Sequence, residues 1–368
     1  MVSKEKKIAF YIGNYSRSGG TERSCISVAN GLAEKKDYKV YLIATNSEKE
    51  KPFFKINSSV ELIHLNCKNV KREYFNLFFL LKKALNENKI NVIVAVEVFS
   101  LLFLLPVFIF NKRKNLKLVI WEHFNFTVSL GKNLRHKLRW LAAKYADGIV
   151  VLTQRDKGLW EDNLKVKGNI KAINNMSPFN ISEEKYSIDS KKVIAIGRLA
   201  YQKGFDLLID LWASLIKENS IDKEWVLQII GSGEDEQELK ERIEEYDMHE
   251  RVEMIPSTNN ISEYYQQASF LAMTSRFEGL PMTLIEAQSF GLPIIAYDCI
   301  TGPSEVISDN SGFLIEENNS AFFVEKIKEL ISNTEMRKLM SDSAKQEVVK
   351  YSKENVIAKW TLFLKELL

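Results

Sequence analysis

Short apolar runs rich in β-branched residues alternate with amphipathic stretches along almost the whole chain, and this alternation is the strongest constraint on the fold. The first half contains the runs KIAFYIGN, KVYLIAT, VIVAVE, LKLVIWE, GIVVLT and IKAINN, and the second half contains KVIAIGRL, WVLQIIGSG, VEMIP, FLAMTS and PIIAYD. Continuous apolar strands that alternate with helices are typical of parallel sheets covered on both faces. The sequence therefore predicts the α/β fold class, with two doubly wound, Rossmann-like domains.

The division into domains follows from the length and from one polar segment. The 368 residues are too many for one ordinary core, and the hydrophobic content of 45% is sufficient for two cores. The segment 177–192 is polar, contains a proline and separates the two series of strands. We therefore predict a first domain at residues 1–182 and a second domain at residues 183–350.

The last segment, residues 351–368, is predicted to be a helix. Val356, Trp360, Phe363 and Leu364 lie on one stripe of it. Because the second series of strands is complete before this segment begins, we expect the helix to pack back on the first domain. A helix that closes its own domain is the alternative.

Cysteine usage and apolar segments bear on the cellular compartment. Cys25, Cys67 and Cys299 are odd in number, far apart and without CxxC spacing, which favours a reducing compartment over a disulfide framework or a zinc site. The N-terminus shows no signal-peptide pattern, so we expect a cytoplasmic protein. The most apolar segment, residues 98–110, contains a proline and has about 13 residues, whereas a membrane-spanning helix needs about 20. A buried helix or a strand-to-helix corner is expected there.

Charge is distributed unevenly between the two halves. Residues 1–187 contain 32 Lys and Arg against 17 Asp and Glu, and residues 188–368 contain 19 against 31. Such an asymmetry predicts that the first half meets something anionic. Nucleic acid, an anionic membrane surface and a phosphorylated acceptor all fit this pattern.

A glycine-rich turn follows the first strand of the first half. In YSRSGGTER, Gly19 and Gly20 let a ligand approach backbone N–H groups, and Thr21 can cap the helix that follows. The pattern differs from the dinucleotide motif G-x-G-x-x-G, and a plain tight turn explains it equally well.

Two cations follow the first strand of the second half. Arg198 and Lys203, in RLAYQKGFDLLID, lie at the mouth of a strand-to-helix loop. Cations at a helix N-terminus oppose the helix dipole, so we infer that a counter-charge is missing between them. A diphosphate fits, because Arg198 offers a planar fork and Lys203 a point charge. Two solvated loop cations are the alternative.

The stretch RFEGLPMTLIEA contains two glutamates separated by a Gly-Leu-Pro turn. Pro281 suits the first turn of a helix, which places Glu286 well inside that helix. Glu278 follows the strand FLAMTS, at the edge where ligands of open α/β sheets bind. The N–H groups of Met282 and Thr283 would face the same phosphates as the two cations. One carboxylate can then hold sugar hydroxyls and the other ribose hydroxyls, and a salt bridge from Glu286 to the core is the alternative.

A histidine follows a strand of the first half. His123, in VIWEHFNF, is expected at the same edge of the sheet as the Gly19-Gly20 turn. A satisfied structural histidine is an equally good explanation. Glu97 and Glu122 end neighbouring strands, and the sequence assigns them no role.

Residues 131–148 show the pattern of a basic amphipathic helix. Apolar residues lie on one stripe, and Lys132, Arg135 and Arg139 are among the cations around it. Such a helix can lie on anionic lipid or hold a pyrophosphate-bearing acceptor. A solvated face over a core helix is the alternative.

Motifs for metal and nucleophile chemistry are missing from the sequence. It contains no D-x-D, H-E-x-x-H, G-x-S-x-G or P-loop pattern, so no metal cofactor is expected. It also lacks the motifs of RNA- and DNA-binding proteins, which argues against a nucleic-acid partner.

Together these motifs resemble the retaining nucleotide-sugar glycosyltransferases of glycosyltransferase family 4, which have the GT-B fold. The matching stretches are SGGTER, WEHFN, GRLAYQKGFDLLI, IIGSGEDEQEL and SRFEGLPMTLIEAQSFGLPIIAYD, together with the final helix. The resemblance implies two Rossmann-like domains that face a central cleft, of which the first binds the acceptor and the second binds the nucleotide-sugar. It also implies that the C-terminal helix crosses back to the first domain.

The resemblance also implies roles for individual residues. Glu278 would contact the transferred sugar, and Glu286 would contact the ribose. Arg198 and Lys203 would neutralise the diphosphate leaving group, and His123 would line the sugar pocket. The residues implied in nucleotide-sugar binding are Gly19, Gly20, Gly279, Leu280, Met282, Thr283, Leu284, Glu286 and Ile255.

The resemblance further implies the reaction. A retaining hexosyltransferase would move a hexose or an N-acetylhexosamine from a UDP-sugar to a hydroxyl without a metal, and the leaving phosphate would take the acceptor proton. Pro256 stands where relatives often have glycine, and its missing N–H removes one possible contact to the base near Ile255.

The stretch TGPSEVI, residues 301–307, and the basic first half resemble bacterial enzymes that extend lipid-linked or polyprenyl-diphosphate-linked glycans. This implies capsule, O-antigen or glycoprotein-glycan assembly, with peripheral contact at the cytoplasmic face of the inner membrane. Two other functions stay open. A nucleotide-sugar 2-epimerase of the same fold would release nucleotide without an acceptor. A non-catalytic nucleotide-sugar-binding protein would be expected to lose the diphosphate cations or Glu278, all of which are present.

Overall fold

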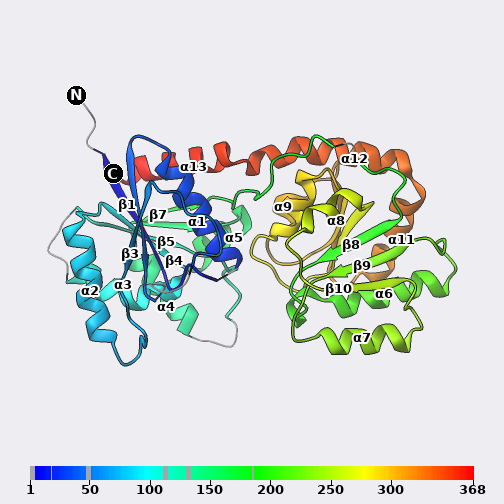
Figure 1. The fold of residues 1–368 in the computed structure, drawn as a ribbon, viewed down its shortest axis with the longest axis horizontal. Coiled ribbons are helices and arrows are strands. Elements are labelled where there is room, and N and C mark those ends of the chain that lie inside the picture. The colour runs from blue at the N-terminus through cyan, green and yellow to red at the C-terminus, as the bar shows by residue number, and fades with distance from the viewer. Residues whose placement is uncertain (1–4, 18, 47–50, 111–114, 130–133, 185) are drawn as a thin grey trace. The chain divides into compact units, whose positions relative to one another are not determined.

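The computed structural model describes residues 5–17, 19–46, 51–110, 115–129, 134–184 and 186–368. The chain divides into two compact units, shown in Figure 1. Residues 1–176 together with 353–368 form the first unit, and residues 177–352 form the second. Each unit contains one parallel sheet with helices packed on its faces. The predicted fold class, α/β with two doubly wound Rossmann-like domains, is confirmed.

The sheet of the first unit has the strand order β3-β2-β1-β4-β5-β6-β7. Its strands are β1 Lys6–Ile12, β2 Tyr38–Ala44, β3 Val60–His64, β4 Val92–Val96, β5 Lys117–Trp121, β6 Gly148–Val151 and β7 Asn169–Ala172. Its helices are α1 Gly20–Ala33, α2 Tyr74–Glu87, α3 Leu101–Ile109, α4 Leu134–Tyr145, α5 Gln154–Asn163 and α13 Lys353–Leu367, and the short 3-10 helix η1 Val98–Ser100 precedes α3. All five residues of β4 are buried, as expected for a central strand covered on both faces.

The sheet of the second unit has the strand order β10-β9-β8-β11-β12-β13. Its strands are β8 Lys192–Ile196, β9 Val226–Ile230, β10 Val252–Ile255, β11 Phe270–Met273, β12 Ile294–Asp298 and β13 Gly312–Glu316. Its helices are η2 Tyr201–Lys203, α6 Phe205–Lys217, α7 Glu236–Glu245, α8 Ile261–Gln267, α9 Met282–Ser289, α10 Pro303–Val306, α11 Ser320–Ser332, α12 Thr334–Glu347 and η3 Val348–Tyr351. In Figure 1, α6 and α7 lie on one side of this sheet, and α9 and α12 lie on the other.

Each sheet has one switch point, at which the strand order changes direction. In the first unit it lies between β1 and β4, and in the second unit it lies between β8 and β11. The connections after these neighbouring strands leave in opposite directions, which opens a crevice at the carboxyl ends of the strands. The loops after β1, β4, β8 and β11 are therefore the places to look for a ligand site.

Helix α13 packs against the first unit and buries the apolar stripe that includes Trp360. The Trp360 ring packs edge-on against Phe10 and Trp121, with centroid distances of 6.1 and 4.8 Å. Gly31 of α1 leaves room for Ile357, because a Cβ at Gly31 would lie 2.5 Å from Ile357 Cδ1. The end of the chain thus completes the core of the first unit.

The segment 177–192 packs on the second unit over its described residues. The Ser177 N–H donates to the Tyr351 carbonyl oxygen at 2.9 Å. The Phe179 ring lies 5.1 Å from the Phe290 ring. This polar segment is therefore part of the second unit and not a free connection.

The predicted strand series lacks β3 and β13. Both are edge strands of their sheets. In β3 only Val60 is buried, and Glu61 and Leu62 face solvent. In β13 only Gly312 and Ile315 are buried, so both strands lack the full burial of a central strand such as β4.

Candidate active site

The loop after β8 is fixed against β11 by a glycine. Gly204 precedes α6 with a φ of +63°, a left-handed conformation that favours glycine. A Cβ at this position would overlap the Thr274 carbonyl oxygen. Thr274, directly after β11, donates its hydroxyl to the Gly204 carbonyl oxygen at 2.7 Å. The start of α6 is therefore held across the switch point of the second sheet.

Lys203 and Glu278 form an ion pair at this switch point. The Lys203 Nζ lies 2.6 Å from Glu278 Oε1, and the two side chains are 20% and 6% exposed. The aliphatic part of Lys203 crosses Gly197, where a Cβ would lie 3.2 Å from Lys203 Cε. The pair joins the loop after β8 to the loop after β11, and part of the Lys203 side chain stays exposed.

The loop that carries Glu278 is supported by the loop after β12. Thr301 donates its hydroxyl to the Glu278 carbonyl oxygen at 2.7 Å. Gly302 has a φ of +103°, and a Cβ there would lie 2.6 Å from Pro281 Cδ and 2.9 Å from the Gly279 carbonyl oxygen. The Thr-Gly pair of TGPSEVI thus supports the backbone around Glu278, a role that the sequence did not reveal.

Arg276 holds the same loop from the other side. Its guanidinium donates two hydrogen bonds to the Asp206 carboxylate, at 2.9 and 2.6 Å. Gln202 Nε2 donates to the Phe277 carbonyl oxygen at 2.9 Å. Because a two-pronged guanidinium–carboxylate contact fixes orientation as well as distance, the backbone before Glu278 is tied to the first turn of α6.

The second glutamate, Glu286, is buried on α9. Tyr265 of α8 donates its hydroxyl to Glu286 Oε2 at 2.8 Å, a partner that no sequence signal marked. Helix α9 begins at Met282, and Pro281 is its N-cap, one residue before the first turn in which the sequence placed it. No described side chain caps this helix, and Met282 and Thr283 are half-buried at its N-terminus.

Three neighbours of these residues can contact a ligand only through their backbone. Leu280 and Leu284 bury their side chains in the second unit. Gly279 has no side chain, and its carbonyl oxygen faces Gly302. The EGLPMTL stretch therefore presents one charged side chain, that of Glu278, beside a series of peptide groups.

Arg198 is exposed and separate from the Lys203–Glu278 pair. Its Nε lies 3.0 Å from Glu234 Oε2, and its side chain is 72% exposed. The prediction that Arg198 and Lys203 both lack a counter-charge is wrong, because each has a carboxylate partner in the structure. The reason is that Glu234 and Glu278 lie on loops distant in sequence, after β9 and β11, which the sheet brings beside the loop after β8.

Ile255 ends β10 and is half-buried. Its carbonyl oxygen accepts a hydrogen bond from the Gly231 N–H at 2.9 Å. A Cβ at Gly231 would overlap the Gly197 carbonyl oxygen, so the loops after β8 and β9 are in direct contact. Ile255 thus lies at the end of the strand beyond β9, where the resemblance places the base.

In the first unit, Gly19 is the N-cap of α1 and Gly20 is its first residue. A Cβ at Gly20 would meet no described atom within 4 Å, so this peptide is accessible. Thr21 does not cap the helix as predicted, because it is the second helical residue. Its hydroxyl donates to Glu97 Oε1 at 3.4 Å.

His123 directly follows Glu122, the residue after the end of β5. Its ring lies 4.6 Å from the Trp121 ring. Burial lowers the pKa of His123 to about 3, so the imidazole is neutral at physiological pH. Its Nε2 is buried without a hydrogen-bond partner among the described residues, which is uncommon for a purely structural histidine.

Helix α4 turns its arginines inward. Arg135 and Arg139 are buried and pair with Glu122, with Arg135 Nη1 at 3.0 Å from Oε1 and Arg139 Nε at 3.5 Å from Oε2. Arg139 also donates to the Asn125 carbonyl oxygen at 2.8 Å. The prediction that these arginines contact lipid or an acceptor at the surface is wrong, because their charges are neutralised inside the unit. Lys132 lies outside the described residues.

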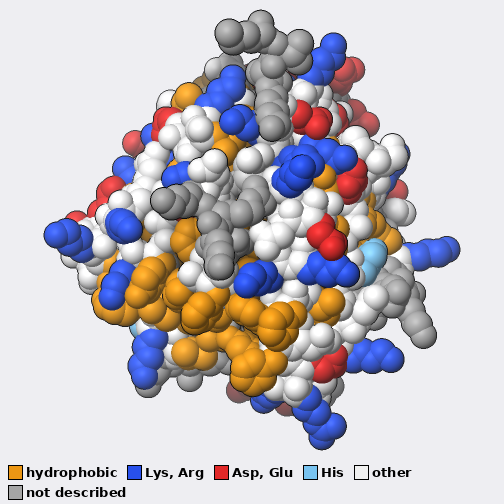
Figure 2. All heavy atoms as spheres, turned by 90° about the vertical axis from the view of Figure 1, so that its left-hand side faces the viewer, with side chains coloured by type: hydrophobic (Ala, Val, Ile, Leu, Met, Phe, Trp, Pro, Cys, Tyr) orange, Lys and Arg blue, Asp and Glu red, His pale blue; other side chains and the backbone are white. Residues whose placement is uncertain are grey.

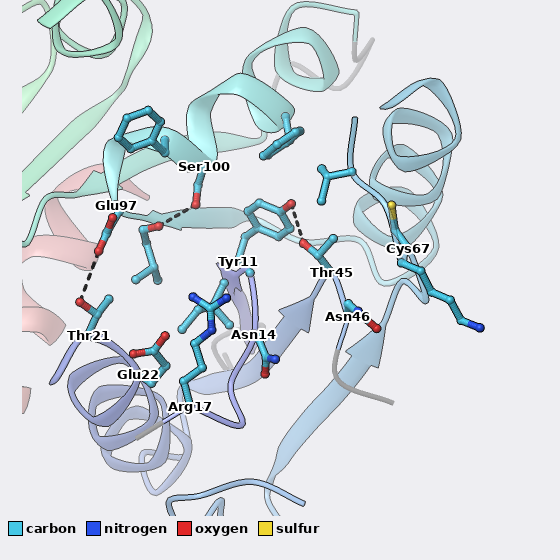
Figure 3. A pocket seen from close by; sticks show the side chains of 17 residues that line it. Tyr11, Asn14, Arg17, Thr21, Glu22, Thr45, Asn46, Cys67, Glu97 and Ser100 are labelled. Atoms are coloured by element: carbon cyan, nitrogen blue, oxygen red, sulfur yellow. Dashed lines mark hydrogen bonds between the residues drawn. The ribbon is translucent and has the colours of Figure 1, made fainter. Parts of the chain in front are cut away.

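A pocket of about 400 Å³ lies at the switch point of the first sheet (Figure 3). Its walls come from the loops after β1, β2 and β4, from the start of α1 and from the segment before α2. The Tyr11 and Thr45 hydroxyls share a hydrogen bond of 2.9 Å in its wall. Figure 3 shows Arg17, Glu22 and Glu97 among the charged groups that line it. The pocket therefore contains charged groups of both signs beside apolar side chains.

Glu97 is the strained residue of this pocket. Its φ of +64° is uncommon for a residue with a side chain, and such strain is often found at functional sites. Its Oε2 lies 3.8 Å from Arg135 Nη2. Burial raises the pKa of Glu97 to about 7, with repulsion from Glu122 adding to the rise and Arg135 opposing it. Its only signal in the sequence is its position at the end of a strand.

Comparison with known families decides the identity of the chain. The family described as Glycosyltransferase Family 4 matches residues 18–176, and the family described as Glycosyl transferases group 1 matches residues 178–347. The chain belongs to glycosyltransferase family 4. It is a glycosyltransferase with the GT-B fold, as the resemblance of its motifs implied.

Several proteins related to this chain come from bacteria. An uncharacterized glycosyltransferase of Haemophilus influenzae is 34% identical over 316 residues, which are 85% of this chain and 87% of that protein. The amylovoran biosynthesis glycosyltransferase AmsD of Erwinia amylovora is 33% identical over 317 residues, 84% of this chain and 86% of that protein. Both relatives are named as glycosyltransferases, in agreement with the family to which the chain belongs.

Two further comparisons carry names that bear on substrates. A Campylobacter jejuni alpha-1,4-N-acetyl-D-galactosaminyltransferase, whose name specifies a glycan on diNAcBac-PP-undecaprenol, is 29% identical over 322 residues, 84% of this chain and of that protein. A mutant of S. aureus TarM, solved in complex with Fondaparinux, alpha-GlcNAc-glycerol and UDP, has a TM-score of 0.79 at 16% identity, over 97% of this chain and 99% of that one. The second likeness shows the shared fold.

The unequal burial of the two cation–carboxylate pairs predicts unequal costs of removing each cation. Lys203→Met removes the cation that lies 2.6 Å from the buried Glu278 carboxylate, and we expect the free energy of unfolding to fall by about 2–4 kcal/mol. Urea unfolding at neutral pH measures the loss.

Arg198→Met is the matched control, because the Arg198–Glu234 pair lies at the surface. Its expected cost is below about 1 kcal/mol. Equal losses of stability in the two variants would contradict a buried pair at the switch point.

Proposed function

We propose that this glycosyltransferase moves a hexose or an N-acetylhexosamine from a UDP-sugar to a hydroxyl of a lipid-linked glycan, with retention of configuration and without a metal. The observation that carries the proposal is the Lys203–Glu278 pair, 2.6 Å apart at the switch point of the second sheet. Ligands of doubly wound sheets bind at this place. A cation beside a carboxylate suits a ligand that is anionic in one part and rich in hydroxyl groups in another.

Lys203 would bind the diphosphate of the donor. Its side chain is partly exposed, its aliphatic part is held against Gly197 and its ammonium group is held by Glu278, so the charge is positioned before the donor arrives. The N-terminus of α9 adds the N–H groups of Met282 and Thr283 and the positive end of a helix dipole. Charge that develops on the departing diphosphate would meet donors already in place, which is the main source of catalysis in such a site.

The two glutamates would recognise the hydroxyl groups on either side of the diphosphate. Glu278 would accept hydrogen bonds from the transferred sugar, since an ionised carboxylate is an acceptor only. Glu286 would accept from the ribose, and Tyr265 orients it for this through the 2.8 Å hydrogen bond. Arg198 would exchange Glu234 for a phosphate oxygen, because its surface pair is weak.

The proposed reaction has one bond broken and one formed at the anomeric carbon. The bond from that carbon to the diphosphate oxygen breaks, and the acceptor oxygen bonds to the same face. The acceptor proton passes to the leaving phosphate, so the products are a glycoside of retained configuration and UDP. Support for UDP comes from the TarM structure, which contains UDP.

The acceptor would bind in the first unit, at the pocket beside Glu97. The Glu97 carboxylate can accept a hydrogen bond from an acceptor hydroxyl there. Its pKa of about 7 suits proton exchange at neutral pH, and its backbone is held in a strained conformation. His123 does not line this pocket, and its place beside the transferred sugar stays a prediction of the resemblance. The C. jejuni relative, whose name specifies an undecaprenol-linked glycan, supports a lipid-linked acceptor.

Nucleotide release from a panel of UDP-, GDP- and ADP-sugars tests this function. With a membrane extract as acceptor source and EDTA present, we expect acceptor-stimulated release from one UDP-sugar. Glu278→Gln should abolish this release, and Lys203→Ala should raise the barrier by about 2–4 kcal/mol, the scale of losing one preorganised group. Glu236→Gln, at an exposed carboxylate of the same unit that pairs with Lys240, is the control and should match the wild type.

Other outcomes of the same assay point to other functions. Release without an acceptor, together with an epimerised sugar, would indicate a nucleotide-sugar 2-epimerase. The absence of release from every donor would indicate a non-catalytic binding protein, and loss of release in EDTA would contradict independence from a metal.

Glu97 carries a pH-dependent prediction. Its carboxyl group has an ordinary pKa of 4.5, raised to about 7 in the fold. Between these values the folded state holds a proton that the unfolded state has lost, so this group lowers the stability of the wild type as the pH rises from about 5 to 8. In Glu97→Gln this contribution is absent, and its free energy of unfolding should rise relative to the wild type over that window, by at most about 3 kcal/mol.

The same variant should lose acceptor-stimulated nucleotide release while it still binds UDP. A gain in stability combined with a loss of transfer separates a functional carboxylate from a structural one. Glu161→Gln, at a half-exposed carboxylate of α5, should keep both the wild-type pH dependence and the wild-type transfer. Transfer that persists in Glu97→Gln would contradict the acceptor assignment.

A further inference from the structure

The helices α2 and α3 expose large apolar side chains on one face of the first unit. Phe75 and Phe79 of α2 are 80% and 64% exposed, and Ile109 and Phe110 at the end of α3 are 54% and 65% exposed. We call these four residues the aromatic face. Figure 2 shows hydrophobic side chains gathered on the side of the unit that carries α2 and α3, with Lys and Arg side chains around them.

The aromatic face is continuous across the two helices. The Phe78 ring lies 5.2 Å from Phe79 and 6.4 Å from Phe110, so it bridges α2 and the end of α3. The Tyr74 hydroxyl donates to the Leu102 carbonyl oxygen at 2.8 Å and ties the helices together near the other end. The exposed side chains are therefore held in one rigid surface and are not scattered single residues.

The fold does not need the aromatic face for its core. Helix α2 buries Leu77, Leu81 and Leu85, and helix α3 buries Leu101 and Leu104, in the core of the unit. Each helix thus has a second apolar face besides the one that packs on the sheet. A helix of a water-facing surface normally carries polar residues there.

Positive charge surrounds the aromatic face. The described residues 68–110 contain six Lys and Arg against three Glu. Lys71, Arg72 and Lys83 are exposed, and the Lys82 Nζ lies 5.8 Å from the centre of the Phe78 ring. Long cationic side chains beside aromatic rings suit a boundary between hydrocarbon and anionic headgroups.

We propose that the aromatic face binds an anionic lipid bilayer, with α2 and α3 lying in the plane of the interface. Phenylalanine rings would enter the acyl boundary while the surrounding lysines and arginines meet lipid phosphates. Within the described part of the chain no helix is long and apolar enough to cross a membrane, and the proposed contact is a peripheral one. The inference rests on the proposed function in one respect, which is that a lipid-linked acceptor brings the enzyme to a membrane.

Charge favours lipid over a second copy of the chain as the occupant. Two copies joined through this face would bring their excess of cations together, and like charges at an interface oppose association. An anionic bilayer neutralises the same cations. Helix α4 was the membrane-binding element predicted from the sequence, but its arginines are buried against Glu122 and cannot contact lipid. The proposal assigns this role to the aromatic face.

Vesicle sedimentation of the full chain tests the proposal. The wild type should bind vesicles that contain phosphatidylglycerol and phosphatidylcholine, and it should bind vesicles of phosphatidylcholine alone much less. Binding to the anionic vesicles should weaken as the salt concentration is raised. Phe75→Ser/Phe79→Ser should weaken binding to the anionic vesicles by at least about tenfold, since it removes the apolar part of the contact. Leu339→Ser/Leu362→Ser is the matched control, because these two residues are 63% and 61% exposed outside the aromatic face, and it should bind as the wild type does.

Three results would overturn the proposal. In the first, the wild type does not bind anionic vesicles. In the second, both double variants lose binding equally. In the third, the wild type self-associates and Phe75→Ser/Phe79→Ser abolishes that self-association. Nucleotide release from a UDP-sugar, measured on the same samples, separates this proposal from the function. Release without vesicle binding refutes the lipid surface alone, and vesicle binding without release refutes the transferase function alone.

Discussion

The ion pair between Lys203 and Glu278 is the interaction on which the site of the second unit depends. It connects the loops that follow β8 and β11, the two strands at which the order of the sheet changes direction. Gly204 lets these two loops come close, and Gly302 lets the loop after β12 approach the loop that carries Glu278, because a side chain at either position would collide with a neighbouring loop. A buried carboxylate is costly without a cation, so the fold and the placement of the two charges are mutually dependent. The same constraint leaves a positioned ammonium group at the place where an anionic leaving group would form.

The two units place a carboxylate at their switch points with different electrostatic results. Glu278 has a cation at 2.6 Å, whereas Arg135, which pairs with Glu97, lies at 3.8 Å and is shared with Glu122. Repulsion from Glu122 therefore adds to burial, and the pKa of Glu97 rises to about 7. One site is thus arranged around a fixed charge pair, which suits a diphosphate sugar. The other site is arranged around a carboxyl group whose pKa lies near 7, which suits an uncharged hydroxyl group as the ligand.

Most of the fold could be predicted from the sequence, and less of the site. The central strands are continuous apolar runs, and the motif SRFEGLPMTLIEA marks Glu278 and Glu286 directly. The edge strands β3 and β13 are only partly buried and are missing from the predicted series. The ion pairs could not be predicted from the sequence. Arg198 pairs with Glu234 and Arg135 pairs with Glu122, and both contacts depend on how the sheet aligns loops that are distant in the sequence. A helical pattern shows which residues share a face but not which face turns inward, so the arginines of α4 were assigned to the surface. Tyr265 and the strained Glu97 are marked by tertiary contacts and backbone geometry, which no local pattern encodes.

The most direct test of the donor site is calorimetric titration of UDP into the full chain and into Lys203→Ala, with EDTA present throughout. We predict that the wild type binds UDP without a metal and that Lys203→Ala binds at least about tenfold more weakly, since the charge that meets the diphosphate is gone. Equal affinity of the two proteins would contradict the placement of the donor at the Lys203–Glu278 pair, and so would UDP binding by the wild type that requires an added divalent cation.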